Sequence, residues 1–400
     1  MLSFDEALEK LLAGAKPVSE TKAMPTIAAA GRVLAEAQYS TLSVPPLDNS
    51  AMDGYAVRAA DCQGLPVYLK VVATSAAGHP PERGIGPGEA ARILTGAVMV
   101  EGADTVVPVE DTDSGTTTVE VRRCAPAGTH VRRAGEDIAA GTVVLGAGTR
   151  LGAAEVGVAA TVGRATLPVR RRPSVAVVST GDELVEPGKG PLGPGQIYES
   201  NRYVLAGLLA ESFGIRAETV AIGDDPASVR AVFDDLVARH DVVISSGGVS
   251  MGGEFDVVKV VLAGSGVDFW QVAIKPAKPL AFGRVGDTTV FGLPGNPVSS
   301  AVSFELFVRP ALRRMLGFEP AVEPPVRGVA GESLGRRDDS KFHFVRVLTG
   351  ADGRVRSAGS QSSNVLSALA AADALAVIPP DRLEVAPGDP VDLIPLGGRR

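Results

Sequence analysis

Three glycine-rich segments that follow short apolar runs are the parts of this chain best suited to chemistry. They are residues 179–184 (STGDEL), 245–250 (SSGGVS) and 292–297 (GLPGNP). Glycine-rich turns expose backbone N–H groups and helix N-termini carry partial positive charge, so both favour a phosphate or another oxyanion. One such turn alone is often only a tight turn. Three of them at the carboxyl edge of one parallel sheet, where ligands bind, predict an anion site.

Charged side chains accompany these turns. Asp182 and Glu183 lie in the first segment, and Asp256 follows the second. The carboxylates would repel an anion unless a cation lay between them, and oxygen ligands beside a phosphate suit Mg²⁺. Lys275 and Lys278 lie in a proline-bracketed segment, where they form a point-charge clamp for an oxyanion. The alternative is that they are two ordinary surface lysines.

Two further polar clusters are open to more than one interpretation. Residues 48–56 hold two carboxylates and an amide, which form either a site loop or only an Asx-turn. Residues 135–138 (GEDI) place two carboxylates after two arginines, which is also typical of a surface ion pair. Neither cluster indicates a function by itself.

The hydrophobic pattern predicts the elements that position these residues. Beyond Pro173, apolar strand-like runs alternate with helical patterns, which predicts βαβ units and a mainly parallel sheet with helices on both faces. Residues 56–133 hold short β-patterned runs between Gly/Pro loops and predict a β-rich domain. From about Pro324 the pattern is that of strands again.

The N-terminal part and the linker carry local signals. Residues 1–38 are expected to form two helices broken at residues 16–17 (KP), because Pro disfavours the helical conformation of the preceding residue. Ser3 and Glu6 form a capping box at the start of the first helix. Residues 170–173 (RRRP) predict a solvated linker rather than a nucleic-acid patch.

Composition excludes several classes of protein. With 45% hydrophobic and 21% charged residues, the 400-residue chain is neither disordered nor fibrous. Its net charge of −7 argues against a nucleic-acid partner bound through bulk charge. No run of ~18 apolar residues occurs and the start lacks a signal-peptide pattern, so no membrane partner is expected. The four scattered histidines argue against a structural zinc site.

The two cysteines, Cys62 and Cys124, cannot form a disulfide framework in a chain this long. We therefore expect reduced thiols, which are typical of a cytoplasmic protein.

Taken together, the motifs resemble those of the molybdopterin molybdenumtransferase family, which inserts molybdenum in molybdenum-cofactor synthesis and includes the gephyrin E domain. They keep the family's order over about residues 40–300, and DNSAMDG with GLPGNP is a highly specific pair. The matching segments are DNSAMDGYAV (48–57), TGA (95–97), GEDI (135–138), STGDEL (179–184), DDP (224–226), SGGVS (246–250), IKPAKP (274–279) and GLPGNP (292–297).

The resemblance implies a multidomain α/β plus β fold. Its centre is a molybdopterin-binding α/β domain with a mainly parallel sheet, joined to a β-rich insertion and a C-terminal β-barrel. The implied domains are a split helical domain of residues 1–42 and 140–172, the inserted β-rich domain of 43–139, the α/β domain of 173–320 and the barrel of 321–400.

The resemblance also implies a reaction. Adenylylated molybdopterin and molybdate are the substrates, the phosphoanhydride is cleaved, AMP leaves, and the dithiolene sulfurs bind molybdenum. The implied catalytic residues are Asp53, Asp137, Glu183 and Asp256. The implied Mg²⁺ ligands are Asp182, Glu183 and Asp256. The implied substrate-binding residues are Thr95, Thr180, Ser246, Gly247, Gly248, Ser250, Lys275, Lys278, Pro294, Asn296, Arg346 and Ser363, of which Lys275, Lys278, Arg346 and Ser363 take molybdate.

Two departures from the family's pattern stand out. The segment of residues 251–256, from the end of GGVS to the acidic Asp256, is one residue longer than is usual in the family, which affects the register of Asp256. Lys341 stands where some members have Arg, so the charge is kept but bidentate geometry is not.

The resemblance further implies partners. We expect a homodimer whose active site is shared between subunits, and contact with the adenylyltransferase that makes the substrate. Two other functions compete with the transferase. A scaffold or peptide-binding module of the gephyrin type does not need the acidic and lysine residues, which are intact here. A Mg²⁺-dependent nucleotide hydrolase is weakened because no GxxxxGK[ST] loop occurs.

Overall fold

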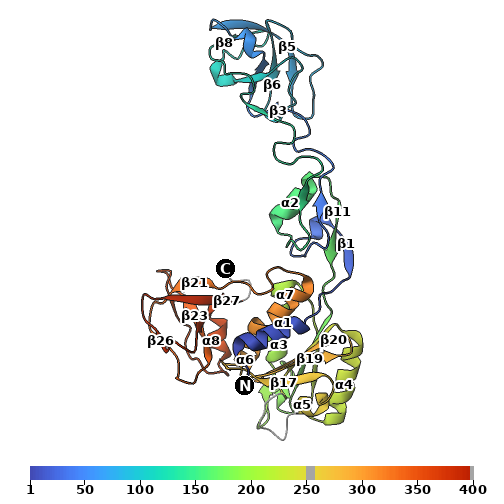
Figure 1. Cartoon of the computed structure of the whole chain (residues 1–400), viewed down its shortest axis with the longest axis vertical. Helices are drawn as coiled ribbons and strands as arrows, with labels where there is room; N and C mark the ends of the chain where they lie inside the picture. The colour runs from blue at the N-terminus through green and yellow to red at the C-terminus, as the bar shows by residue number, and fades with distance from the viewer. Residues whose placement is uncertain (249–256, 397–400) are drawn as a thin grey trace. The chain divides into compact units, whose positions relative to one another are not determined.

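The structure, a computed structural model, describes residues 1–248 and 257–396 and forms two compact units. The first unit comprises Met1–Lys22, Gly31–Val33 and Val169–Arg400, and the second comprises Ala23–Ala30 and Leu34–Pro168. Figure 1 labels the elements of both units. Among the described residues, every helix is too short or too polar to cross a bilayer.

A mixed sheet forms the centre of the first unit, with the strand order β15-β12-β16-β20-β19-β17. The strands are β12 (Val175–Thr180), β15 (Glu218–Ile222), β16 (Val242–Ser246), β17 (Val267–Gln271), β19 (Pro279–Val285) and β20 (Thr288–Leu293). Strands β15, β12, β16 and β20 are parallel, whereas β19 pairs antiparallel with β20 and β17 pairs antiparallel with β19. Every residue of β12, β16 and β20 is buried, because parallel strands are covered on both faces. The predicted mainly parallel sheet is therefore present.

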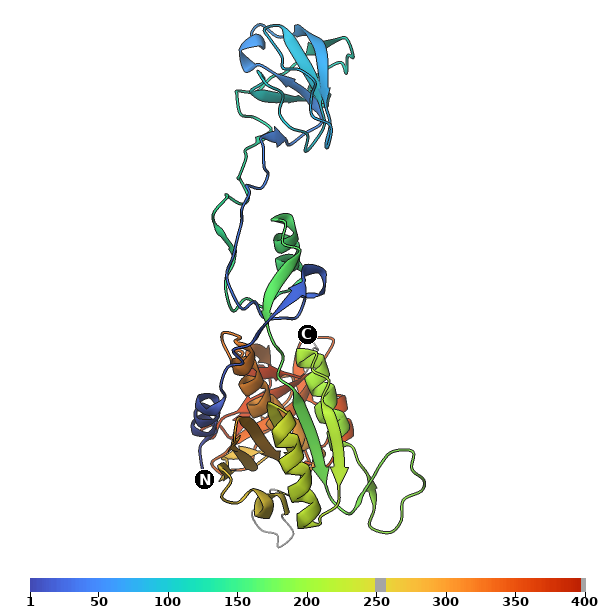
Figure 2. The ribbon, with the colours of Figure 1, turned by 90° about the vertical axis from the view of Figure 1, so that its right-hand side faces the viewer.

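Helices cover both faces of this sheet (Figure 2). Along β12, Val175 and Val177 join the hydrophobic cluster that contains α1, α3 and α6, whereas Ala176 and Val178 join the cluster that contains α4 and α5. The helical elements of the unit that precede its C-terminal region are α1 (Phe4–Gly14), α3 (Asn201–Phe213), α4 (Pro226–Arg239), α5 (Val257–Leu262), α6 (Pro297–Ser303), the π-helical η4 (Phe304–Val308) and α7 (Arg309–Leu316).

Local sequence signals set the ends of these helices. Ser3 and Glu6 form the predicted capping box at α1. Asp225 caps α4, whose first residue is Pro226, and a Pro at that position loses no helical hydrogen bond. Gly214 ends α3 at φ +61°, a conformation that costs glycine little.

A second sheet makes the C-terminal region β-rich, with the order β18-β23-β25-β27-β21 and β24 beside β23. Strand β18 (Ile274–Lys275) lies in the chain between β17 and β19 of the first sheet. It pairs in parallel with β23, which places Lys275 opposite His343. The other elements of this region are β21 (Val326–Val329), β22 (Leu334–Gly335), β23 (Phe342–Thr349), β24 (Val355–Ser357), α8 (Leu366–Ala370), β25 (Ala374–Ile378), β26 (Glu384–Val385) and β27 (Pro390–Pro395). The small pair β13 (Leu184–Val185) and β14 (Ile197–Tyr198) precedes α3.

The second unit is built around a sheet with the order β7-β4-β6-β5-β8. Its strands agree with the β-patterned runs of residues 56–133, and they are β4 (Gly54–Val57), β5 (Val67–Ser75), β6 (Glu89–Ile93), β7 (Thr105–Pro108) and β8 (Thr118–Val121). Smaller elements are η1 (Thr26–Ala28), β2 (Gln38–Tyr39), β3 (Asn49–Ser50), η2 (Ala59–Asp61), η3 (Val109–Asp111), β9 (Val131–Arg132), β10 (Val143–Leu145) and α2 (Ala153–Thr161). Strands β1 (Thr21–Pro25) and β11 (Thr166–Arg170) lie where the chain passes between the two units.

The second helix expected within residues 1–38 is wrong. Strand β1 and the short η1 occupy that stretch, and α1 is followed by extended chain. Long-range pairing overrides local propensity here, because Thr26 Oγ1 donates a hydrogen bond to the carbonyl of Arg164. The structure also places α1 in the core of the first unit, where the Phe4 ring lies 5.4–5.8 Å from the rings of Phe307, Phe342 and Phe344.

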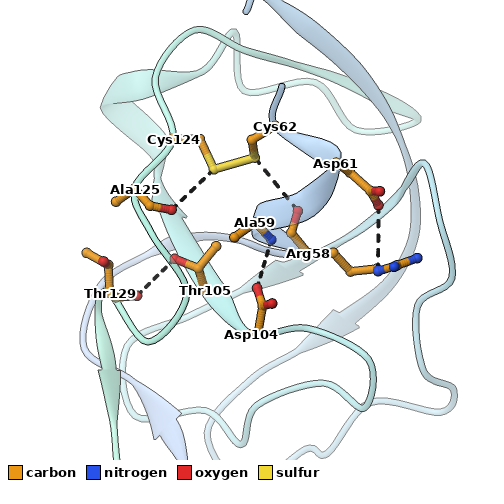
Figure 3. Close-up of a disulfide and its surroundings, with 9 residues drawn as sticks. All are labelled: Arg58, Ala59, Asp61, Cys62, Asp104, Thr105, Cys124, Ala125 and Thr129. Carbon is orange, nitrogen blue, oxygen red and sulfur yellow. Dashed lines mark hydrogen bonds and ion pairs between the residues drawn. A yellow bond between two sulfur atoms is a disulfide. The ribbon is translucent and has the colours of Figure 1, made fainter. Parts of the chain in front are cut away.

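The expectation of free thiols is wrong in this structure, because Cys62 and Cys124 form a disulfide (Figure 3). Cys62 follows η2 and Cys124 follows β8, and their Cα atoms lie 6.1 Å apart. The partners are 62 residues apart in the chain, so only the pairing of the strands of this sheet brings them together. A count of two cysteines carries no information about that pairing.

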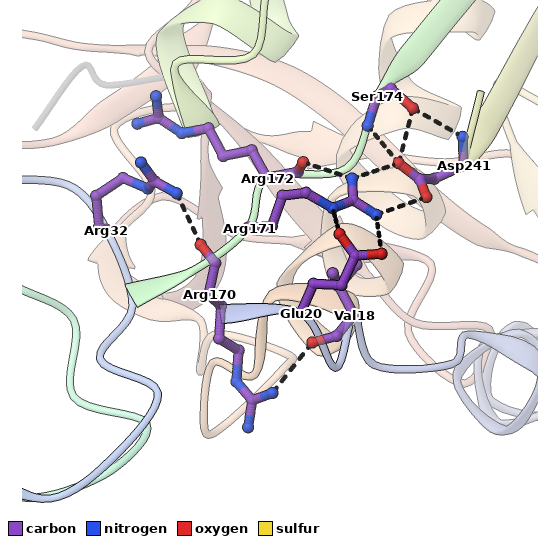
Figure 4. A network of polar contacts seen from close by, with 8 residues as sticks. All are labelled: Val18, Glu20, Arg32, Arg170, Arg171, Arg172, Ser174 and Asp241. Carbon is purple, nitrogen blue, oxygen red and sulfur yellow. Dashed lines mark hydrogen bonds and ion pairs between the residues drawn. The ribbon is translucent and has the colours of Figure 1, made fainter. Parts of the chain in front are cut away.

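The predicted solvated linker is anchored rather than free. The Arg171 guanidinium donates bidentately to the Asp241 carboxylate at 2.7 and 2.9 Å, and it also pairs with Glu20 (Figure 4). The backbone N–H and the hydroxyl of Ser174 donate to the same Asp241 oxygen at 2.6 and 2.7 Å. Asp241 directly precedes β16, so the linker is fixed to the start of a central strand.

Candidate functional site

The carboxyl ends of β12, β16 and β20 open into a cleft of about 1830 Å³ within the first unit. Loops of the C-terminal β-rich region form its other wall. Many residues predicted from sequence meet in its lining, namely Thr180, Glu183, Ser246, Gly247, Gly248, Lys275, Lys278, Pro294, Asn296 and Ser363. Ser250 and Asp256 lie outside the described residues.

The turn after β16 and the end of β12 form a cradle of exposed backbone. Gly247 and Gly248 adopt φ +99° and +67°. A Cβ on Gly248 would lie 2.7 Å from a methyl group of Val258, so a side chain does not fit there. Thr180 Oγ1 is buried without a hydrogen-bond partner among the described residues. An orphaned hydroxyl beside glycine backbone fits a ligand that brings its own acceptor oxygens.

Asn201 is a cleft residue that the sequence did not indicate. It begins α3, and its Nδ2 donates to Ser246 Oγ at 2.8 Å and to the carbonyl of Gly295 at 2.6 Å. Asn201 therefore ties the start of α3 to two of the three glycine-rich turns. An Asn at a helix start is equally typical of a cap, and its partners lie 45 and 94 residues away in the chain.

Three carboxylates gather at the ends of β12 and β15. Asp182 Oδ1 accepts from the backbone N–H of Asp224 at 3.1 Å, and Asp224 Oδ2 accepts from that of Asp182 at 3.4 Å. Burial raises the pKa of Asp224, and the charges of Asp182 and Glu183 raise it further. Glu183 and Asp224 line the cleft. The sequence indicated Asp224 only through the DDP motif, and its role as a site residue was missed.

This carboxylate group is compatible with a hard cation. The mutual repulsion that raises the pKa of Asp224 would be relieved by a divalent ion, and oxygen atoms are the ligands that Mg²⁺ prefers. Within residues 1–248 and 257–396, however, no group of three or more His, Cys, Asp or Glu side chains has metal-binding geometry. Asp256 lies outside that part of the chain, so these residues suit Mg²⁺ only as part of a ligand set.

Basic groups also line the cleft. Lys275 and Lys278 both lie in its wall, with Ala277 between them at φ +79°. The register of β18 with β23 brings Lys275 opposite His343, and Lys341 is part of the same wall. The wall therefore offers several N–H donors to an oxyanion.

Arg346 is placed differently from the expectation that it binds molybdate directly. The residue is 1% exposed and its guanidinium donates to the carbonyls of Ser360 and Ser362 at 2.6 and 3.1 Å. Burial lowers the pKa of Arg346. Arg346 therefore holds the 360–363 segment in place and does not reach the cleft.

Ser363 connects this segment to the sheet. Its Oγ accepts from Asn296 Nδ2 at 3.0 Å, and its carbonyl accepts from the Val298 N–H at 3.1 Å. Asn296 and Val298 flank the first residue of α6. The predicted site residues Asn296 and Ser363 are thus in direct contact.

The remaining predicted residues lie in the second unit. Asp53 Oδ1 accepts from the backbone N–H of Thr95 at 2.6 Å and from its hydroxyl at 2.7 Å, and these bonds lower the pKa of Asp53. Asp53 and Thr95 therefore form one pair. Asp137 is exposed in the loop before β10, where its N–H donates to the carbonyl of Val44 at 3.0 Å.

The fold and the site define a multidomain α/β protein with a cleft at the carboxyl edge of its sheet that glycine-rich turns, carboxylates and lysines line. The chain matches family models of the MoeA N-terminal region (domain I and II) at residues 2–163, the probable molybdopterin binding domain at 176–314 and the MoeA C-terminal region (domain IV) at 336–396.

Similar proteins point the same way. Molybdopterin molybdenumtransferase 2 of Mycobacterium tuberculosis is 43% identical over 91% of this chain and 92% of that protein. The Haemophilus influenzae molybdopterin molybdenumtransferase is 37% identical over 99% and 98%. The crystal structure of the molybdopterin biosynthesis MoeA protein from Pyrococcus horikoshii OT3 superposes with a TM-score of 0.86 at 29% identity, covering 98% and 99% of the two chains. The chain belongs to the molybdopterin molybdenumtransferase family, and the resemblance inferred from its motifs is confirmed.

Proposed function

We propose that this protein is the transferase that inserts molybdenum from molybdate into adenylylated molybdopterin. AMP leaves when the phosphoanhydride bond breaks, and molybdenum becomes bound by the two dithiolene sulfurs. The observation that carries the proposal is the cleft in which three glycine-rich turns, a carboxylate group and paired lysines meet. A scaffold has no need of this combination, so that alternative is not favoured.

The chain's own residues supply the binding chemistry. The backbone of Gly247 and Gly248 and the orphaned Thr180 hydroxyl suit the phosphate and nucleotide. Lys275 and Lys278 suit molybdate, because charge-assisted hydrogen bonds are the strong ones for an oxyanion. With the two substrates held in one cleft, the reacting atoms are positioned rather than brought together by diffusion.

We propose Mg²⁺ as the cation of the carboxylate group, held by Asp182, Glu183 and Asp256. Asp224, which shares hydrogen bonds with Asp182, is the additional candidate that the structure supplies. When bound, the ion would neutralise the negative charge of the phosphoanhydride oxygens.

The remaining features of this proposal come from the family resemblance. Asp53, Thr95 and Asp137 complete the cleft of a partner subunit in a homodimer, and the adenylyltransferase that makes the substrate is a further partner. The β-rich C-terminal region forms a barrel, the four-domain boundaries apply, and the protein works in the cytoplasm.

The test is an assay of AMP release. Purified protein is incubated with adenylylated molybdopterin, molybdate and Mg²⁺, and AMP is measured by chromatography. We expect AMP to appear only when molybdate and Mg²⁺ are both present. A control with ATP in place of the adenylylated pterin separates this reaction from general nucleotide hydrolysis. Substrate binding without AMP release would support the scaffold instead.

A further inference from the structure

Asp339 is a carboxylate that lies among basic groups of the cleft. Asp339 Oδ1 lies 2.9 Å from His343 Nε2, and Asp339 Oδ2 lies 3.6 Å from Lys341 Nζ. The Arg336 guanidinium lies 3.7 Å from Asp339 Oδ1. All four residues line the cleft. An anion that belongs to the protein therefore lies among the groups that an oxyanion would need.

The α/β sheet contributes to the same cluster. Lys275 is the last residue of β18, and the pairing of β18 with β23 places it opposite His343. Burial opposes ionisation of Asp339, but His343, Lys341 and Lys275 together hold the pKa of this carboxyl below its usual value. Asp339 is therefore negatively charged at neutral pH.

The cationic groups differ in how much freedom they have. Arg336 donates to the carbonyls of Arg382 at 2.8 Å and Arg337 at 2.6 Å, and its side chain is 1% exposed. It anchors the segment and has little freedom to meet a ligand. The Lys341 side chain is 23% exposed and contacts Asp339 without a close hydrogen bond. Lys341 can therefore exchange Asp339 for another anion by a small side-chain movement.

We propose that Asp339 is an internal counter-anion that sets the affinity of the cleft for its oxyanion substrate. It pairs with Lys341 and lies within hydrogen-bond distance of His343 while the cleft is empty, and an entering oxyanion must compete with it for the same groups. This inference rests on the proposed function, because it concerns the oxyanion of that reaction. Asp339 is a specificity-determining residue in this scheme and takes no part in bond breaking.

If Asp339 competes with the oxyanion, removing the charge of Asp339 should increase the affinity of the cleft for that oxyanion. Two unit charges about 6 Å apart in a solvated cleft repel by an energy equivalent to about three- to tenfold in binding. We expect Asp339→Asn to bind molybdate about three- to tenfold more tightly than the wild type at low ionic strength. The gain should shrink at high salt, where charges are screened. A generally damaged cleft would lose affinity, so the direction of the change separates the two cases.

The experiment is titration calorimetry of the full-length protein with sodium molybdate, with melting temperatures to confirm folding. Asp338→Asn is the matched control, because Asp338 lines the same cleft and the change removes the same charge one residue away. It should change affinity less than about twofold. Asp339→Glu keeps the charge and should show no gain.

Unchanged or weaker binding by Asp339→Asn overturns the inference, and so does an equal gain in Asp338→Asn, which would indicate bulk charge. Absence of molybdate binding by both the wild type and Asp339→Asn also overturns it. The proposed function is judged separately by AMP release from wild-type protein. If the wild type releases AMP but the Asp339→Asn change does not alter molybdate affinity, the proposed function stands and only the role of Asp339 is refuted.

Discussion

Glu183 is an exposed carboxylate at the carboxyl end of β12, in the lining of the cleft. Its charge contributes to the raised pKa of Asp224, so the two groups share one electrostatic environment. An exposed carboxylate adds little to the stability of the sheet. Its place at the cleft edge is explained by a ligand that it serves, which is the metal in the proposed reaction.

We expect Glu183→Gln to abolish AMP release and to change the melting temperature by less than about 2 °C, because exposed substitutions rarely alter stability. The measurement is AMP formation at saturating Mg²⁺ and molybdate, beside thermal unfolding. Exposed Glu9→Gln, in α1, is the control and should retain full activity. Wild-type turnover by Glu183→Gln would refute the metal assignment.

Among single residues, the sequence predicted those that lie in a recognisable local motif. Gly247, Gly248 and Lys275 were found because each lies in a motif next to a strand end. Asn201 and Asp224 were missed because their significance depends on partners from other strands. Arg346 was predicted to bind molybdate, whereas in the folded structure its guanidinium donates to the Ser360 and Ser362 carbonyls, a contact that no local pattern indicates.

The segment 360–363 is an element whose position depends on one buried side chain. Four hydrogen bonds join Arg346 to residues 360–362, two from the guanidinium and two that pair its backbone with the Gln361 amide. Ser363 then contacts the start of α6. The C-terminal wall of the cleft is therefore fixed from inside the β-rich region.

We expect Arg346→Met to lower the free energy of unfolding by about 2–4 kcal/mol, since hydrogen bonds from a buried charged group are lost. It should also raise the half-saturating substrate concentration more than it lowers kcat, because the wall is displaced while the reacting groups stay. The measurements are urea unfolding and steady-state AMP release. Arg356→Met removes a half-buried arginine of neighbouring β24, whose ion pair with the exposed Asp352 lies away from residues 360–363, and should affect neither quantity much. If stability falls while the half-saturating substrate concentration is unchanged, Arg346 stabilises the fold but does not position the wall of the cleft.

The contribution of the linker's ion pair, Arg171 with Asp241, to the free energy of unfolding depends on pH. The Arg171 hydrogen bonds hold the pKa of Asp241 at about 2, below the reference value of 3.8. A lowered pKa stabilises the folded state above pH 3.8, and this contribution is lost as the pH falls through about 2. We expect Asp241→Asn to lower the free energy of unfolding at pH 7 by about 2 kcal/mol, with the difference from wild type shrinking as the pH falls from about 4 to about 2.

Urea unfolding followed by Trp270 fluorescence at pH 7, 5 and 2.5 measures this dependence. Asp287→Asn is the control, because that aspartate is fully exposed at the end of β19 and should change stability little at any pH. A constant difference between Asp241→Asn and wild type across this range would contradict the assignment.

Elements with a strong period or a clear cap were predictable. The helical stretch of residues 297–316 is present as α6, η4 and α7, and the parallel strands appear where apolar runs predicted them. The stretch after residue 16 was not predictable as a strand. Its strand β1 pairs with β11 more than 140 residues later, so no local window contains the partner. The anchoring of residues 170–173 to Asp241 is equally non-local.

At the scale of the whole molecule, the proposed homodimer with shared sites can be tested by complementation between two inactive variants. We expect Asp53→Ala and Glu183→Ala homodimers each to be inactive. After dissociation and random re-pairing, half of the dimers are mixed, and each mixed dimer holds one site with neither defect. Activity should therefore return to roughly a quarter of wild type.

The mixed dimers are confirmed by native mass spectrometry with one isotope-labelled chain, and AMP release is the readout. A site formed within one chain predicts no recovery at any mixing ratio. Zero activity in confirmed mixed dimers would therefore place Asp53 and Glu183 in the same chain's site and exclude the shared arrangement.

The Cys62–Cys124 disulfide makes a covalent ring of the backbone that contains β5, β6, β7 and β8. A single peptide-bond cut inside this ring, for example by trypsin after Arg83 with its 54% exposed side chain, opens the ring without separating the two pieces. On a denaturing gel we expect the nicked protein to run as one chain without reductant and as two fragments with it. Cys62→Ser should give two fragments under both conditions. Most of this sheet thus has a second covalent connection that keeps its strands together after proteolytic damage.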